Sequence, residues 1–233
     1  MTMASLLAPA RRNGTEILDG DDLDPRLVRR SMRDVARANA IFGGASALLA
    51  ELEPALRGLP PVATLLDVGT GLGDIPARAR ARARISGVEL RTTGADIAPE
   101  LAAASAAMID AAVCADALQL PFADDSFDIV TCSQVLHHFP GASGAALLRE
   151  MNRVARQRVV ISDIRRSWTA AAGLWTASFP LFFHPVSRHD GVVSVLRGFT
   201  PDELERLVDQ AVGTKAPVSK RFVFRVTTSW RPQ

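Results

Sequence analysis

A glycine-rich turn followed by an acidic residue is the clearest chemical signal in the sequence. Residues 65–74 read LLDVGTGLGD, in which a short apolar strand must turn sharply into a helix. Glycine permits the backbone angles of such a turn and lets the main chain approach a ligand closely. Asp96 ends the next strand-like segment, where a carboxylate can accept hydrogen bonds from two ribose hydroxyls. Together these features predict a site for a nucleoside-containing cofactor.

The spacing of the glycines narrows the type of cofactor. The dinucleotide fingerprint is G-x-G-x-x-G, which brings a pyrophosphate to a helix N-terminus. Here the glycines fall as G-x-G-x-G, and Asp74 stands at the start of the helix. A carboxylate at that point repels a pyrophosphate but not the ammonium of an amino acid. The sequence therefore favours a cofactor with an amino-acid part.

Histidines are the candidates for acid–base chemistry. All of them lie after the fourth and fifth predicted strands: His137, His138, His184 and His189. That is the carboxyl end of the predicted sheet, where open α/β folds bind ligands. The first two are candidates for a base, with packing or hydrogen bonding as the alternative. His189 beside Asp190 is a candidate oriented base, with a surface turn as the alternative.

Alternating strands and helices position these residues. The pattern predicts strands at 64–69, 88–95, 111–115, 127–132 and 158–162, with helices at 75–83, 98–108 and 142–155. Such alternation needs crossover connections, and hence a parallel sheet with helices on both faces.

The last part of the chain departs from this rhythm. Thr200, Pro201 and Glu203 predict a helix start with a capping box. Strand-like runs at 216–220 and 222–229 follow, and too few residues separate them for a crossover. They must pair as an antiparallel hairpin. The fold class is therefore α/β: a Rossmann-like seven-stranded sheet of five parallel strands plus an antiparallel C-terminal hairpin.

The residues before this pattern predict an N-terminal helical cap. Asp24-Pro25 starts one helix, Gly43-Gly44 breaks it, and a second helix spans 46–56. We expect a cap at 1–61 and a main domain at 62–233, with an insertion at 168–198.

Composition limits the possible partners. The net charge is +2 and only two residues are lysine, so nothing suggests a nucleic-acid patch. Arginines recur at 26, 29, 30, 33 and 37, which we interpret as a solvated helix face, with a phosphate-binding stripe as the alternative. Cys114 and Cys132 lie in apolar runs and are expected to be buried thiols, with no disulfide and no metal.

The longest apolar run predicts no stable membrane insertion. Residues 168–183 fall short of the roughly 20 residues that a membrane span needs, and Pro180 interrupts them. The N-terminal residues contain too short an apolar run for a secretory signal. We expect a soluble, cytoplasmic protein.

Several segments resemble class I S-adenosylmethionine (SAM)-dependent methyltransferases. Residues 69–74 resemble the SAM-binding motif of that family. DALQLPF at 116–122 and DDSFD at 124–128 resemble its adenine-binding loop and fourth strand. SQVLHHF at 133–139 and FTPDEL at 199–204 resemble its later segments. The resemblance covers about residues 60–213 in the family's order, and is nearest to the subgroup with ubiquinone and menaquinone methyltransferases.

The resemblance implies roles for individual residues. Five would surround the methionine part of SAM: Asp67, Gly69, Thr70, Gly71 and Gly73. Asp96 would bind the ribose and Ile97 would pack on the adenine. Asp116 would accept from the adenine amino group, the amide of Ala117 would reach a ring nitrogen, and Ser133 would close the pocket near the sulfonium.

The resemblance also implies where the acceptor binds. In related methyltransferases the region that corresponds to 168–198 covers the acceptor. Here it is rich in large apolar side chains, at 168, 174, 175, 179 and 181–183. We expect some to be core and others to line an acceptor pocket, with Arg33, Asn39 or Phe42 completing it. The prediction is methyl transfer, with oxygen favoured, to a small aromatic or lipophilic acceptor.

Three other functions are alternatives to this prediction. A non-catalytic protein of the same fold would bind SAM or a small ligand without turnover. A nicotinamide oxidoreductase would use a similar sheet, but the glycine spacing disfavours it. A nucleic-acid methyltransferase would carry an Asn-Pro-Pro-aromatic type segment after the fourth strand, where this sequence has SQVLHHF. The oligomeric state is left open.

Overall fold

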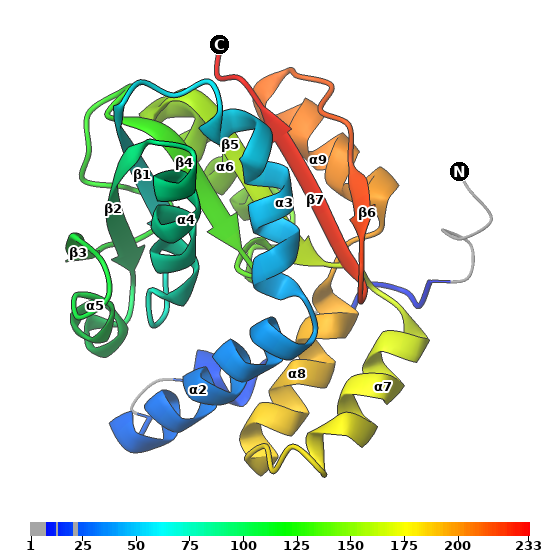
Figure 1. Cartoon of the computed structure of the whole chain (residues 1–233). Helices are drawn as coiled ribbons and strands as arrows, with labels where there is room; N and C mark the ends of the chain where they lie inside the picture. The colour runs from blue at the N-terminus through cyan, green and yellow to red at the C-terminus, as the bar shows by residue number, and fades with distance from the viewer. Residues whose placement is uncertain (1–7, 13, 21–22) are drawn as a thin grey trace.

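A seven-stranded mixed sheet forms the centre of the protein. The computed structural model describes residues 8–12, 14–20 and 23–233. The strand order is β3-β2-β1-β4-β5-β7-β6 (Figure 1). The strands are β1 Val62–Val68, β2 Glu89–Asp96, β3 Ala111–Cys114, β4 Phe127–Ser133, β5 Ala155–Ile164, β6 Ser219–Arg221 and β7 Arg225–Trp230. Strands β1 to β5 pair in parallel, whereas β7 is antiparallel to both β5 and β6. The predicted fold class is confirmed.

Helices cover both faces of this sheet. On one face lie α3 Gly44–Leu56 and α4 Asp74–Ile85, and on the other α6 Ala142–Val154 and α9 Pro201–Val212. The short α5 Pro99–Ser105 contacts the outer strands β2 and β3. Helix α9 begins with the expected capping box, in which Thr200 and Glu203 bond to each other's backbone N–H groups. Strands β1, β2, β4 and β5 are therefore largely buried between two helical layers, whereas β3 forms an exposed edge.

The N-terminal helices have different surroundings. Helix α2 Pro25–Ile41 extends past the carboxyl ends of the strands, and its five arginines are exposed, as expected for a solvated face. Helix α3 instead packs in the core of the main domain, with Leu48, Leu52 and Leu56 fully buried. The domain boundary at residue 61 stays a prediction.

The insertion forms a helical pair, α7 Trp168–Ser178 and α8 Pro185–Arg197, which lie side by side (Figure 1). With α2 and the short helix η1 Ile17–Asp19 they make a cap over the carboxyl end of the sheet. Large apolar side chains of this pair divide between two environments. Leu174 and Phe183 face a cavity under the cap, whereas four aromatic side chains are exposed: Trp168, Trp175, Phe179 and Phe182.

The two cysteines also differ from each other. Cys132 is buried in β4, as expected. Cys114 is exposed, so the expectation of two buried thiols was wrong for this residue. It ends β3, the edge strand, where one side of the strand lacks a neighbour. Among the described residues, no helix has the length and apolarity needed to cross a membrane.

Candidate active site

One large cavity lies between the carboxyl ends of the strands and the cap. Its volume is about 1210 Å³, above the roughly 300–1,000 Å³ of ordinary small-molecule pockets. Its walls come from the loops after β1, β2, β3 and β4 on one side, and from η1, α2, α7 and α8 on the other. The space is sufficient for two small molecules side by side.

The glycine loop gives this cavity a wall of bare backbone. Gly69, Gly71 and Gly73 have φ angles of 70°, 56° and 76°, in the left-handed region that favours glycine. A Cβ on Gly69 would lie 2.3 Å from Cγ2 of Val135, so no other residue fits there. A Cβ on Gly71 would meet nothing within 4 Å, because this residue borders open cavity. A ligand can therefore lie directly against the main chain at Gly71.

Asp96 is held in a fixed orientation beside this loop. Its Oδ2 accepts from the backbone N–H of Gly71 at 2.9 Å, and its Oδ1 accepts from that of Ala98 at 3.0 Å. The residue lines the cavity and is 8% exposed. Each carboxylate oxygen has capacity for a second hydrogen bond. The geometry is compatible with the predicted contact to ribose hydroxyls.

Three carboxyl groups make this end of the cavity acidic. Burial raises the pKa of Asp67 to about 7, although a hydrogen bond from Thr131 opposes the shift. Burial also raises the pKa values of Asp74 and Asp96. A shift in this direction means that the ionised forms lack compensating positive charge. Such a site attracts a cation and repels a pyrophosphate.

Unpaired polar atoms support the same interpretation. Oδ2 of Asp74, Oγ1 of Thr70 and Oγ of Ser133 are buried without a hydrogen-bond partner among the described residues. All three residues line the cavity. Buried polar groups are normally paired, so these atoms are suited to the ammonium and carboxylate of an amino acid. The residues present therefore fit SAM, which has both groups and a cationic sulfur.

The structure gathers most of the predicted cofactor residues around this end. The members that line the cavity are Asp67, Gly69, Thr70, Gly71, Asp96, Ile97, Asp116, Ala117 and Ser133. Ile97 is 70% exposed, which leaves an apolar side chain free for a flat ring. Gly73 is the exception, since it lies behind the wall, where a Cβ would be 3.2 Å from Cβ of Ser105. Their individual roles stay predictions.

Of the four candidate histidines, two line the cavity. His184 lies outside the lining; its Nδ1 accepts from the N–H of Val186 at 3.3 Å, at the start of α8. His189 also lies outside it and has a half-exposed side chain. The expected contact between His189 and Asp190 exists, at 2.8 Å. His137 and His138 lie in the cavity wall.

His137 has the geometry of an oriented base. Its Nδ1 lies 2.8 Å from Oδ1 of Asp163, and its backbone N–H donates to Oδ2 of the same residue at 3.1 Å. Ionised Asp163 can only accept, so Nδ1 carries the proton and Nε2 presents a lone pair. This Nε2 is buried without a hydrogen-bond partner in the described chain, 3.8 Å from Oε1 of Glu16. Although burial raises the pKa of Asp163, its contacts with His137 and the N–H of Ile164 outweigh burial and hold the pKa below its usual value.

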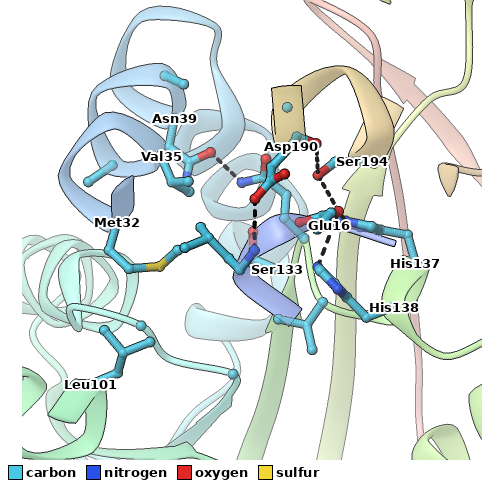
Figure 2. Close-up of a pocket in the computed structure, with 18 of the residues that line it drawn as sticks. Glu16, Met32, Val35, Asn39, Leu101, Ser133, His137, His138, Asp190 and Ser194 are labelled. Atoms are coloured by element: carbon cyan, nitrogen blue, oxygen red, sulfur yellow. Dashed lines mark hydrogen bonds and ion pairs between the residues drawn. The ribbon is translucent and has the colours of Figure 1, made fainter. Parts of the chain in front are cut away.

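His138 is placed differently. Its Nδ1 lies 3.1 Å from Oδ1 of Asp19 and 3.2 Å from Nη1 of Arg197. Burial lowers its pKa, but the hydrogen bond to Asp19 and the charge of Glu16 outweigh burial and raise the pKa overall. Figure 2 shows Glu16 close to both histidines and to Ser194. His138 is therefore part of a charged cluster and less suited to act as a free base.

The same cluster has the residue types of a metal site. Ligand atoms of Glu16, His137 and His138 lie within 4.8 Å of one another. The guanidinium of Arg197 already contacts Glu16 at 3.2 Å and Asp19 at 2.8 Å, so the protein supplies its own cation here. The expectation that no metal binds stays a prediction.

The sequence pattern did not predict a role for three further groups in or directly behind the cavity wall. Asp163 is a charged residue near the end of the fifth apolar strand, a signal that the sequence did contain. Glu16 precedes the first predicted helix and nothing in the local pattern marks it. Arg225 interrupts the apolar run of the last strand and lies in the cavity wall.

Known proteins resemble the chain in both sequence and fold. Residues 66–161 match the family model described as a methyltransferase domain. Demethylmenaquinone methyltransferase of Mycolicibacterium paratuberculosis is 40% identical over 108 residues, 43% of this chain. The match spans 46% of that relative, so the chain corresponds to about half of its length.

Solved structures share the fold at low identity. A SAM-dependent methyltransferase from Aquifex aeolicus superposes with a TM-score of 0.61 at 14% identity, covering 91% of this chain and 100% of that one. A putative O-methyltransferase from Nostoc punctiforme has a TM-score of 0.64 at 13% identity, covering 97% of this chain and 66% of that one. These likenesses concern the architecture of the sheet and its helices.

Proposed function

We propose that the chain, which contains a SAM-dependent methyltransferase domain at residues 66–161, transfers a methyl group to a hydroxyl of a small aromatic or lipophilic acceptor. The observation that carries the choice of a hydroxyl is the free Nε2 of His137, oriented by Asp163 in the cavity wall. A non-catalytic binding protein, the alternative, would not need a histidine that Asp163 orients in this way.

The cofactor end has the groups that SAM requires. The glycine loop and Asp96 would hold the amino-acid part and the ribose, and the nearby carboxyls favour a cationic ligand. SAM supplies a methyl group activated on a positive sulfur, so that an O–CH₃ bond replaces the S–CH₃ bond and the C–S electron pair stays on sulfur. The protein's task is then to align the acceptor and exclude water.

His137 would take the proton that the acceptor hydroxyl loses. The carboxylate of Asp163 fixes the proton on Nδ1, which leaves Nε2 as the acceptor of a second proton. The imidazolium formed would lie between Asp163 at 2.8 Å and Glu16 at 3.8 Å, and both carboxylates stabilise its charge.

The remaining cavity walls support an apolar acceptor. Met32, Val35 and Phe42 of the α2 region and Leu174 and Phe183 of the insertion all line the cavity. Mostly apolar walls with few polar groups are typical of small-molecule sites. The relative whose name gives demethylmenaquinone as its acceptor is consistent with this class.

The test is the variant His137→Gln, assayed with SAM and a panel of hydroxylated aromatics by mass spectrometry. We expect kcat to fall by roughly 10²–10⁴-fold, because proton removal loses its base, while affinity for S-adenosylhomocysteine (SAH) is unchanged. His189→Gln is the matched control, since that side chain lies outside the cavity lining, and it should keep kcat.

Two results would contradict the proposal. One is full activity of His137→Gln on a hydroxyl acceptor. The other is methylation of a peptide or RNA by the wild type when no hydroxylated aromatic is methylated. SAH binding without product from any acceptor would favour the non-catalytic alternative.

A further inference from the structure

Arg225 is a buried cation for which the described residues supply no hydrogen-bond or salt-bridge partner. It begins β7 and is 7% exposed. Its Nε is buried without a hydrogen-bond partner. No acceptor in the described part of the chain bonds to its two terminal nitrogens, and no carboxylate there lies within salt-bridge distance. Native proteins rarely leave a guanidinium in this state.

The free end of this side chain faces the cavity. Arg225 lines the cavity, as does Ile164, its antiparallel partner in β5. The terminal nitrogens are not among the fully buried unpaired atoms, so they keep accessible surface. Because the residue as a whole is buried, that surface opens into the cavity.

The protein incurs an energetic cost for this arrangement. Burial lowers the pKa of Arg225 to about 10, and only the charge of Asp163 opposes the shift. The group nevertheless stays charged at neutral pH. An unpaired charge in an apolar wall destabilises the folded state unless a ligand neutralises it.

Arg225 belongs to the acceptor end of the cavity. Strands β4 and β5 separate β7 from β1, so three strand spacings, roughly 14 Å, lie between β7 and the strand that leads into the glycine loop. Nearby wall residues are apolar, among them Val223, Phe224 and Ile164. The carboxylate of SAM, next to the glycine loop, would be too distant to be its partner.

We propose that Arg225 binds a carboxylate of the methyl acceptor, so that the substrates are aromatic or lipophilic hydroxy acids. The planar guanidinium matches a planar carboxylate with two parallel hydrogen bonds. A single guanidinium among apolar neighbours neutralises one negative charge, which suits a carboxylate better than a doubly charged phosphate. The inference rests on the proposed function for the identity of the second ligand in the cavity.

The proposed base His137 and the proposed anion-binding residue Arg225 both lie next to Asp163. His137 is hydrogen bonded to Asp163, and Arg225 precedes Val226, the strand partner of Asp163. An acceptor with its carboxylate on Arg225 would thus be anchored beside the base. This contact would distinguish hydroxy acids from neutral phenols.

The experiment is calorimetric titration of the SAH-loaded protein with hydroxybenzoate isomers, their methyl esters and benzoate. In the wild type we expect the acids to bind roughly tenfold or more tightly than their esters, since a charge-assisted pair is lost in the ester. In Arg225→Met the preference should fall to about one, and Arg225→Lys should restore part of it.

Arg158→Met is the matched control. It removes the same charge from the other end of β5, away from the cavity, and should keep the preference for acids. A purely structural role for Arg225 would show as a lower Tm in Arg225→Met. We instead expect an unchanged Tm, or one raised by roughly 2–4 °C, because a buried unpaired charge is removed.

The outcomes separate the two proposals. Equal binding of acids and esters by the wild type, a preference that survives in Arg225→Met, or loss of SAH binding in that variant would each overturn the role of Arg225. If benzoate binds through Arg225 but no hydroxybenzoate is methylated, the anion site stands and the proposed function fails. If the methyl esters are methylated as fast as the acids, the proposed function stands and the role of Arg225 fails.

Discussion

The two ends of the cavity are built in opposite ways. At the cofactor end, the wall consists of loop backbone and of carboxyl groups in the last residues of two consecutive strands, Asp67 of β1 and Asp96 of β2. At the acceptor end, the wall consists of side chains from segments far apart in the chain, such as Glu16, His137 and Arg225. The first end depends on local conformation, and the second depends on tertiary contacts.

This difference predicts how each end responds to mutation. Changes in the glycine loop should affect cofactor affinity first, because the backbone itself is the wall. Changes in the cap should leave the cofactor bound and weaken binding of the acceptor. Three variants test this separation.

The largest effect is expected for Gly69→Ala. The new Cβ would lie 2.3 Å from Cγ2 of Val135 at a φ of 70°, so the loop must move. A displacement of this size should reduce SAH affinity by roughly 100-fold in calorimetry. Gly87→Ala is the control, with a φ of 76° but open space around its Cβ. Its strain of about 1–2 kcal/mol should lower stability without changing SAH affinity. Wild-type SAH affinity in Gly69→Ala would show that the ligand does not use this loop.

A smaller effect is expected for Asp190→Ala in the cap. Asp190 accepts from the backbone N–H groups of Ile17 and Leu18 at 2.8 and 3.0 Å, and so fixes the segment that bears Glu16. Without it, the KM for the acceptor should rise about tenfold, while SAH affinity stays constant. The exposed Asp209→Ala is the control and should change neither quantity. An equal loss of SAH affinity in Asp190→Ala would show that the two ends are not independent.

The smallest effect concerns the pH dependence of cofactor binding. Burial raises the pKa of Asp67 from its ordinary value to about 7. Cationic SAM needs the ionised form, so its affinity should rise up to about tenfold from pH 6 to pH 8. Because the pKa of Asp67 is higher in the folded chain than in the unfolded chain, protonated Asp67 stabilises the fold at low pH. This stabilisation is lost as the pH rises through about 7.

Asp67→Asn is the control for that measurement. Without the titrating group, SAM affinity should vary little between pH 6 and pH 8, and the unliganded variant should gain stability over the wild type at pH 8. A wild-type affinity that does not change with pH would show that Asp67 stays ionised throughout.

Local signals made the sheet and the cofactor end predictable. The glycine spacing and Asp96 follow from short-range rules for turns and strand ends. The antiparallel hairpin followed from the short distance between its two strands, and the capping box of α9 from three residues. For such features the sequence neighbours are also the neighbours in space.

The acceptor end was predicted only in part, for a physical reason. His137 and His138 were candidates because they follow β4, but the partner that selects His137 is Asp163, at the end of another strand. Helix α3 packs against the sheet through its leucines. Their spacing would fit a helix of a separate cap equally well, so the sequence could not distinguish the two placements. The sequence also did not predict that Trp175 and Phe179 are exposed. Apolar residues lie all around α7, so their periodicity could not assign its inner face.

The hydrogen bonds that hold η1 have a consequence for synthesis of the protein. Ile17 bonds to Asp190, and Glu16 to Ser194 and Arg197, across sequence separations of 173, 178 and 181 residues. This segment is therefore translated long before the residues that bind it. Because closing so long a loop costs conformational entropy, we expect these contacts to form after the central strands have paired. We therefore expect the cofactor end of the cavity to form before the cap covers the acceptor end.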